Sequence, residues 1–172
     1  MTNSFSKLFD KTPSVWITSF WGWSPESWGC VGFTNQQRPH TIANVTSNPF
    51  IMLVYVTQSA PGDSKYKGKL TDFYELSHEI KDKSEFMAPF QLNNPHHPQQ
   101  AWKHSFKALR AWTIKENEMP WIADFYPEVY SKKLYRSIST WAKELPKKQI
   151  ELLNVLNFDE VSVYDKVREQ NG

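Results

Sequence analysis

The most unusual feature of this sequence is a group of five large aromatic residues within thirteen positions: Trp16, Phe20, Trp21, Trp23 and Trp28. In a strand, Trp16 and Phe20 share one face while Trp21 begins a turn, so the five rings cannot all enter one core layer. Exposed rings can stack on a nucleobase at about 1–3 kcal/mol per base, and a cage of rings encloses a flipped or methylated base. Ordinary core packing is the alternative for each ring, most of all for Trp16 and Phe20.

Hydroxyl, amide and basic side chains could complete a nucleic-acid site. Ser19, Ser24 and Asn35 lie near enough in sequence to form hydrogen bonds with base edges. No acid occurs between Glu85 and Glu116, whereas lysines, an arginine and histidines do, which favours a basic face for a polyanion. The residues assigned to phosphates are Lys65, Lys67, Lys69, Lys103, Lys107 and Arg110. A second basic block, at residues 131–148, is equally typical of a solvated helix surface.

Hydrolysis is a competing chemistry. Lys69 and Glu75 share a strand face by even spacing, with His78 just beyond, so they could act as an acid–base pair. An exposed strand face explains the same spacing without any reaction. Cys30, the only cysteine, lies in an apolar stretch and is expected to be buried rather than nucleophilic. The expectation is therefore a binding protein without catalytic residues.

Neither a metal nor a cofactor is expected. His96 and His97 are adjacent and His104 follows, but neighbouring side chains on a proline-flanked loop rarely point to one ion, and carboxylates are absent from this stretch. The sequence contains no GxxxxGK[ST], GxGxxG or GxSxG motif. Phosphate-loop, dinucleotide-binding and hydrolase-elbow chemistry therefore have no support.

Short strands dominate the first two thirds of the chain, and helices follow. Runs rich in β-branched and aromatic residues predict strands at 14–20, 28–34, 50–57, 67–77 and 106–114, with a closing or edge strand at 158–164. The run at 50–57 is continuously apolar, which predicts a strand buried on both faces. Residues 25–28 are expected to form one helical turn after Ser24, and residues 84–105 a loop.

An apolar stripe predicts a helix that starts near Ser131. Leu134, Ile138, Ala142 and Leu145 recur at helical spacing. Pro146 then opens a second helix over residues 147–156. Five or six short strands with peripheral helices predict an α+β fold, a small mixed β-barrel.

Size and composition indicate one globular domain. The chain has 172 residues and a mass of 20.2 kDa, and aromatic residues make up 15% of it. Rings must supply much of the core, which excludes disorder throughout. No apolar run reaches the roughly 18–20 residues of a membrane span, and residues 1–10 lack a signal peptide's apolar stretch. A soluble, cytoplasmic protein without a membrane partner is expected.

The order of these segments resembles the PUA-like superfamily, which includes the EVE, ASCH and YTH domains. The matching segments are residues 16–21 (WITSFW), 50–56, 67–77 (KGKLTDFYELS) and 102–112, with Ala108-Leu109-Arg110-Ala111-Trp112 in the last. The resemblance spans most of residues 14–165. It implies a single PUA-like domain over residues 1–172 with a cleft that holds one nucleotide, often a modified base in an aromatic cage.

Several members of the superfamily are similar to modified-DNA sensors of bacterial defence. The resemblance therefore implies a reader of a flipped, modified base that prefers DNA to RNA and has a nuclease as a possible partner. By position, Ser19, Trp21 and Trp23 would lie at the cage mouth with Trp28 beside them, and Asp72 and Tyr74 would face the cage. The alternatives are an ASCH-like amidohydrolase acting on modified nucleosides and a protein-interaction module that uses exposed tryptophans.

Overall fold

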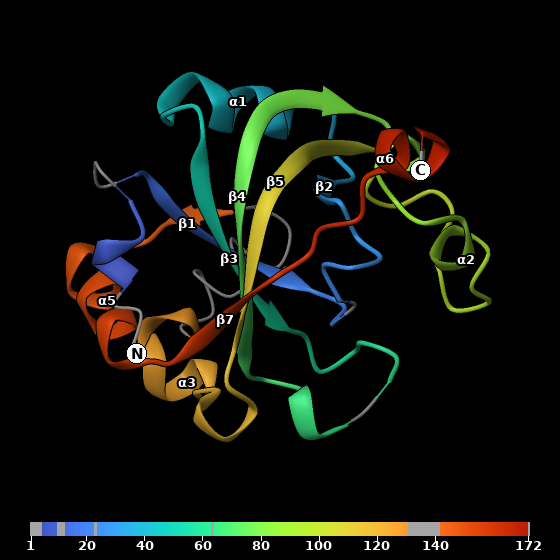
Figure 1. Cartoon of the computed structure of the whole chain (residues 1–172). Helices are drawn as coiled ribbons and strands as arrows, with labels where there is room; N and C mark the ends of the chain where they lie inside the picture. Colours follow the sequence, from blue (N-terminus) through green and yellow to red (C-terminus); the bar gives the residue numbers. More distant parts are fainter. Residues whose placement is uncertain (1–4, 10–12, 23, 63, 131–141, 172) are drawn as a thin grey trace.

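A mixed seven-stranded sheet forms the centre of the molecule (Figure 1). The computed structural model describes residues 5–9, 13–22, 24–62, 64–130 and 142–171. Six strands follow one another in the order β2-β5-β4-β3-β1-β6, and β7 pairs separately with β5. Their bounds are β1 Val15–Phe20, β2 Cys30–Phe33, β3 Phe50–Val56, β4 Leu70–Lys81, β5 His104–Ile114, β6 Lys143–Glu144 and β7 Phe158–Val161.

Strand β3 is the buried centre of the sheet. All seven of its side chains are buried, as the continuous apolar run predicts. Those of Ile51, Leu53 and Tyr55 enter a first core cluster. Those of Phe50, Met52 and Val54 enter a second core cluster on the opposite face. Strand β3 lies parallel to β1 and antiparallel to β4. The connection between the parallel strands contains β2 and helix α1 (Gln37–Val45).

Strands β4 and β5 are long and curved, and they carry the curl of the sheet (Figure 1). Their pairing shifts register after Glu75 and again after Leu76. Such irregularities bend a strand and increase its twist. The first part of β5 pairs with β2 and the last part with β7, so one strand joins segments from both ends of the chain.

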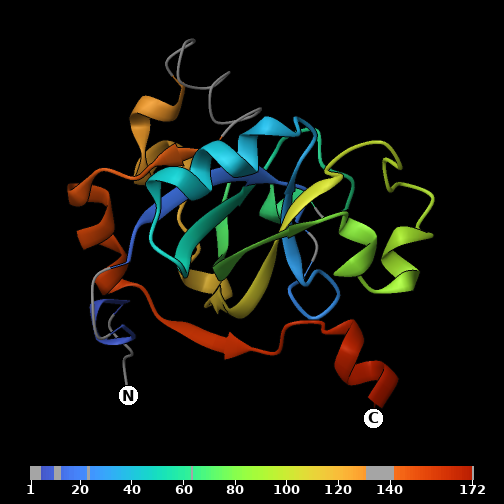
Figure 2. The same ribbon diagram turned by 90° about the horizontal axis from the view of Figure 1, so that it is seen from above.

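Helices cover both faces of the sheet. Helix α1 buries Ile42 in the second core cluster, while α3 (Ile122–Phe125) and α5 (Lys147–Leu152) lie on the other side with the first cluster. Figure 2 shows β7 leading along one side of the molecule to α6 (Lys166–Asn171). Helix α2 spans Pro89–Leu92. Short 3₁₀ helices occupy Phe5–Lys7, Ser64–Tyr66, Lys83–Glu85, Glu116–Glu118, Pro127–Tyr130 and Leu153–Val155.

The coarse expectation of an α+β fold with a small mixed sheet is confirmed, and six strands lie close to their predicted positions. The turn at 25–28 is also present, because the Trp28 amide donates to the Ser24 carbonyl at 3.0 Å. The predicted loop at 84–105 contains α2 instead of being wholly irregular.

The predicted helix from Ser131 is wrong at its end. Ala142 and Leu145 are buried, but the residues between them form β6. The Leu145 amide donates to the Val15 carbonyl at 2.8 Å, so pairing with β1 replaces helical hydrogen bonds here. The start of that predicted helix lies outside the described residues.

Candidate functional site

A small aromatic pocket opens where β1 ends beside β2. Its volume is about 170 Å³. It is lined by Ser19, Phe20, Trp21, Trp28, Val31, Gly32, Thr57, Ser59 and Trp102. We call it the tryptophan pocket. The segments that form it are far apart in the sequence, and the curl of the sheet brings them together.

Three indole rings form the body of the pocket. The Trp102 ring lies between the other two, with its centroid 5.2 Å from that of Trp21 and 5.6 Å from that of Trp28, both in edge-to-face geometry. Trp28 is only 2% exposed and packs on Phe20 at 5.1 Å, so it forms the floor. Trp21 and Trp102 are partly exposed, so they present ring surface to an incoming group.

Trp102 has an unusual backbone conformation. Its φ is 56°, a left-handed value that bulky residues rarely adopt and that costs about 1–3 kcal/mol. The surroundings hold it in place, because its amide donates to Thr34 Oγ1 at 3.2 Å and its carbonyl accepts from Ser105 Oγ at 2.9 Å. Gly32 allows the close approach, since a Cβ there would lie 2.8 Å from the Trp102 carbonyl oxygen. Strained residues of this kind cluster at functional sites.

A buried lysine holds the loop that leads to Trp102. Lys83 is 3% exposed, and its ammonium group donates to the carbonyls of Pro98 at 2.9 Å and Ala101 at 2.6 Å. The same nitrogen lies 5.8 Å from the centroid of the Trp102 ring. Burial lowers the pKa of Lys83 from its ordinary value. Lys83 therefore fixes the backbone on which Trp102 sits.

His97 packs against the Trp28 and Trp102 rings. Its ring centroid lies 6.1 Å from that of Trp28 and 6.1 Å from that of Trp102. Burial lowers its pKa to about 4, with the nearby Lys83 charge acting in the same direction. His97 is therefore neutral at physiological pH and supports the rings as an uncharged wall.

Hydroxyl groups line the rest of the pocket. Thr57 Oγ1 and Ser59 Oγ lie 3.3 Å apart, and Ser19 joins them in the lining. Hydroxyls both donate and accept, so they can pair with the edge of a polar ring held against the indoles. The pocket can thus bind a flat group through its faces and its edge.

The structure brings three of the seven predicted base-pocket residues together. Ser19, Trp21 and Trp28 all line the tryptophan pocket. Trp23 lies outside the described residues. Phe20 and Trp16 follow their core alternative: Phe20 is 6% exposed, and Trp16 packs against the second core cluster.

The other predicted residues lie elsewhere. Asp72 lines a different, neighbouring pocket. Asn35 is exposed before α1, where its Oδ1 accepts from the Gln37 amide at 2.9 Å. Tyr74 is 0% exposed and packs within the second core cluster. Asp72 and Tyr74 share a face of β4, but core packing encloses Tyr74 whereas Asp72 opens into the neighbouring pocket.

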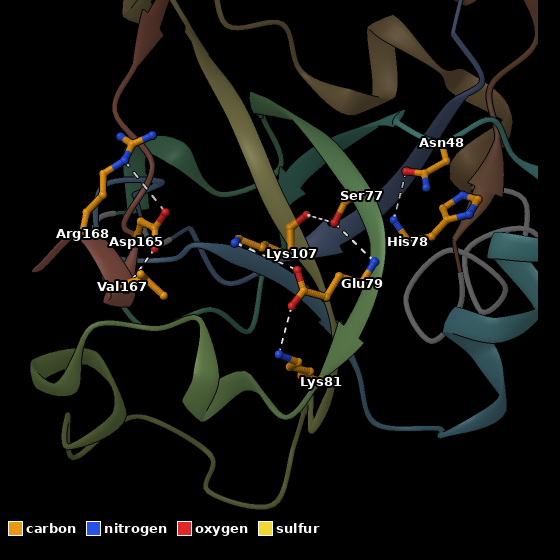
Figure 3. Close-up of polar contacts among 9 residues, drawn as sticks. All are labelled: Asn48, Ser77, His78, Glu79, Lys81, Lys107, Asp165, Val167 and Arg168. Atoms are coloured by element: carbon orange, nitrogen blue, oxygen red, sulfur yellow. Dashed lines mark hydrogen bonds and ion pairs between the residues drawn. The ribbon is translucent and has the colours of Figure 1, made fainter. Parts of the chain in front are cut away.

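Half of the predicted phosphate ligands pair with acids. Glu79 lies between Lys81 and Lys107, at 3.0 and 4.0 Å (Figure 3). Arg110 forms a two-pronged pair with Glu160 at 2.8 and 3.3 Å.

Lys65 pairs with Glu116 at 2.9 Å. Lys69 lies over the Trp121 ring at 4.8 Å. Lys67 is partly exposed near them, and Lys103 directly follows Trp102. Of the predicted phosphate residues, Lys103 is therefore the one that adjoins a lining residue of the tryptophan pocket in sequence.

The residues of the hydrolytic alternative do not form one site. Lys69 contacts Trp121, whereas Glu75 lies beside Arg110, and burial raises the Glu75 pKa. His78 Nε2 lies 2.9 Å from Thr46 Oγ1, and the His78 amide donates to Asn48 Oδ1 at 3.2 Å (Figure 3).

Cysteine and metal chemistry gain no geometric support in the described part of the chain. Cys30 is buried, and burial raises its pKa to about 12, so its thiol stays protonated. His96 is exposed while His97 is buried, so the two rings point apart. Among the described residues, no group of three or more histidine, cysteine or acidic side chains is placed to hold a metal ion.

Sequence reasoning missed several residues that build the pocket. Trp102 belongs to the matching segment 102–112 but is not among the predicted cage residues, and neither are Gly32, Thr57, Ser59 and Lys83. A tryptophan directly after a proline-rich loop was the available signal. Its positive φ and the buried ammonium behind it have no sequence signature.

No family model and no curated protein matches the chain. Among solved structures, it is similar to the NMR structure of Rpa0253 from Rhodopseudomonas palustris, a structural-genomics target. The identity is 11%, the match covers 81% of this chain and 90% of that chain, and the TM-score is 0.45. None of the helices formed by the described residues has the length and apolarity to cross a membrane.

Proposed function

We propose that this domain binds nucleic acid, with DNA favoured, and holds one flipped, modified base in the tryptophan pocket. The observation that carries the proposal is Trp102, a strained residue held between Trp21 and Trp28 with ring surface left partly exposed. The segment order that resembles PUA-like modified-base readers supports the same assignment. Such a reader would give a separately encoded nuclease its target.

The size of the pocket favours a single ring system. Drug-sized ligands occupy pockets of about 300–1,000 Å³, whereas a cavity of about 150 Å³ accepts benzene. At about 170 Å³, the tryptophan pocket matches one flat group and leaves little spare room. A modified base suits it better than an extended ligand.

Each wall of the pocket has a part in the proposed binding. Because the Trp21 and Trp102 planes lie 74° apart, the base stacks face-on against one of these rings and meets the other at its edge. Stacking contributes about 1–3 kcal/mol per base, which offsets the few kcal/mol needed to unstack it from the duplex. Ser19, Thr57 and Ser59 pair with its edge. The face-on contacts test size and shape, and the hydroxyls test polarity.

Fewer basic residues than predicted are available for phosphate contacts. Within the described residues, Lys67, Lys69 and Lys103 form no ion pair with an acid, in contrast to Lys65, Lys107 and Arg110. Lys103 lies next to Trp102 in sequence, so it is the first candidate to bind the phosphate beside a flipped nucleotide. Such contacts position the strand without selecting its sequence.

Fluorescence anisotropy with labelled duplexes tests the proposal. The duplexes carry plain, methylated or hydroxymethylated cytosine or adenine, and matching RNAs are measured in parallel. We expect Trp21→Ala and Trp102→Ala to weaken binding of the preferred modified duplex about 5- to 150-fold each, the equivalent of one lost aromatic contact with the base. Phe90→Ala is the matched control, because Phe90 is an exposed ring, 67% accessible, outside the pocket.

Two outcomes would contradict the proposal. One is that the folded wild-type protein binds none of the nucleic acids at low salt, where phosphate contacts are strongest. The other is that Trp21→Ala and Trp102→Ala, folded by circular dichroism, bind as tightly as Phe90→Ala. Consumption of a free modified nucleoside would favour the hydrolase alternative instead.

A further inference from the structure

A second, larger pocket adjoins the tryptophan pocket. Its volume is about 450 Å³. The segment after β1 separates the two, since Phe20 and Trp21 line the first pocket while Gly22 and Ser24 line the second. Its wall includes Val56, Thr71, Asp72, Thr113, Ile114, Met119 and Val161, with Glu26, Lys115, Glu116 and Asp159 around them. We call it the Asp72 pocket.

A β-bulge directs two consecutive side chains into this pocket. In the ladder between β3 and β4, Val54 pairs with Asp72 and Tyr55 pairs with Leu70, so Thr71 has no partner residue across the ladder. Consecutive residues of a regular strand point to opposite faces, but at the bulge Thr71 and Asp72 both line the same pocket. Bulges often re-aim a side chain next to a functional site.

The Asp72 carboxylate and the Thr71 hydroxyl are both buried, and both can form further hydrogen bonds. Asp72 is 7% exposed and accepts one hydrogen bond, from Thr113 Oγ1 at 2.7 Å. A carboxylate has room for about four. The Thr71 hydroxyl, 5% exposed, lies near enough to Asp72 to lower its pKa but makes no hydrogen bond of standard geometry with a described residue. Buried polar groups of this kind usually have a partner.

The surrounding charge is negative. Glu116 pairs with Lys65 at 2.9 Å and Asp159 with Lys115 at 2.6 Å. Asp72 and Glu26 form no ion pair with any cation in the described part of the chain. The local excess of carboxylates repels phosphate and favours a positive group.

We propose that the Asp72 pocket binds a small organic cation, an ammonium or guanidinium group on a short alkyl body. The cation donates hydrogen bonds to the Asp72 carboxylate and to Thr71 Oγ1. The alkyl part lies against Val56, Ile114 and Met119, which supply the apolar wall. This site is independent of the proposed nucleic-acid function, since it takes a ligand of opposite charge in a separate pocket.

The proposal is tested by titrating the whole protein with n-butylammonium and with n-butylguanidinium. Binding is measured by isothermal calorimetry and by shifts in the protein's NMR spectrum. Neutral n-butanol and anionic butyrate have similar apolar bodies and serve as ligand controls. We expect saturable binding of at least one cation and none of the controls. Asp72→Asn, which keeps the shape and one acceptor oxygen, should weaken cation binding about 10- to 150-fold, the range of a charged hydrogen bond.

Two further variants make the result specific. Thr71→Val removes the spare hydroxyl at nearly constant shape and should weaken binding less than Asp72→Asn does. Glu79→Gln removes an exposed carboxylate elsewhere on β4 and should change nothing. Equal binding of butanol and butylammonium, unchanged binding by folded Asp72→Asn, or no binding of either cation up to tens of millimolar would overturn the proposal.

Discussion

Asp72 makes the stability of this protein depend on pH in a direction opposite to most carboxylates. Burial raises its pKa from an ordinary value of 3.8 to about 6, although the Thr71 and Thr113 hydroxyls oppose the shift. A raised pKa means that the folded state holds the proton more tightly than the unfolded chain does. The stabilisation is complete below pH 3.8 and is lost as the pH rises through about 6.

The size of the effect follows from the pKa difference. One pKa unit corresponds to about 1.4 kcal/mol, so ionised Asp72 costs up to about 3 kcal/mol of unfolding free energy at pH 7.5. Asp72→Asn cannot ionise, and its amide oxygen can still accept from Thr113. We therefore expect Asp72→Asn to be more stable than wild type by up to about 3 kcal/mol at pH 7.5, and to show no such gain at pH 3.5.

Urea unfolding of both proteins at intervals from pH 3.5 to 7.5 measures this difference. Comparison at each pH is essential because His97, with its pKa lowered to about 4, gives a slope of opposite sign over an overlapping range. Subtracting the two curves cancels that contribution. Glu79→Gln, on the exposed surface, is expected to stay within about 1 kcal/mol of wild type throughout. A variant that is less stable than wild type at pH 7.5, by the same amount at every pH, would refute the reasoning.

Three further predictions concern the tryptophan pocket and its surroundings. Gly32→Ala should destabilise the fold by about 1–3 kcal/mol and weaken binding of modified duplexes, because the new Cβ would displace the Trp102 backbone; unchanged unfolding and anisotropy curves would contradict this. Lys83→Met should cost about 1.5–3 kcal/mol in urea unfolding, since the carbonyls of Pro98 and Ala101 lose an ammonium donor, whereas Lys81→Met, on the exposed surface, should cost far less. Arg110→Ala should change the salt dependence of nucleic-acid binding less than Lys103→Ala, because Glu160 already pairs with Arg110; a larger effect of Arg110→Ala would restore it to the phosphate set.

Much of the sheet is predictable because its strands carry strong local signals. The apolar run of β3 gives its burial on both faces directly. Helix α1 lacks such a signal, since only Pro39 and Ile42 are buried in it and no apolar stripe marks it. The two-residue strand β6 exists only because β1 offers it a partner. Elements formed by tertiary pairing alone cannot be found from periodicity.

The candidate site is predictable only where its residues are close in sequence. The density of rings identifies Trp21 and Trp28, but Trp102 reaches them through a loop whose path depends on the buried Lys83 ammonium. A run of basic residues in the sequence fails to predict a free basic surface for a similar reason. The interval around Lys107 contains no acid, yet Glu79 lies beside that lysine on a neighbouring strand.

The divided pairing of β5 has a consequence for how the chain folds. Residues 111–113 of β5 pair with β4 on one side, but the other side of residues 111–114 pairs with β7, which lies more than forty residues further along the chain. Until β7 is made, that half of β5 offers unpaired amides and carbonyls at an open edge, which other chains can extend. Such long-range pairing forms slowly. The nascent chain is therefore most exposed to aggregation in the interval between these two strands, and charged Arg110 and Lys115 flank the edge during that time.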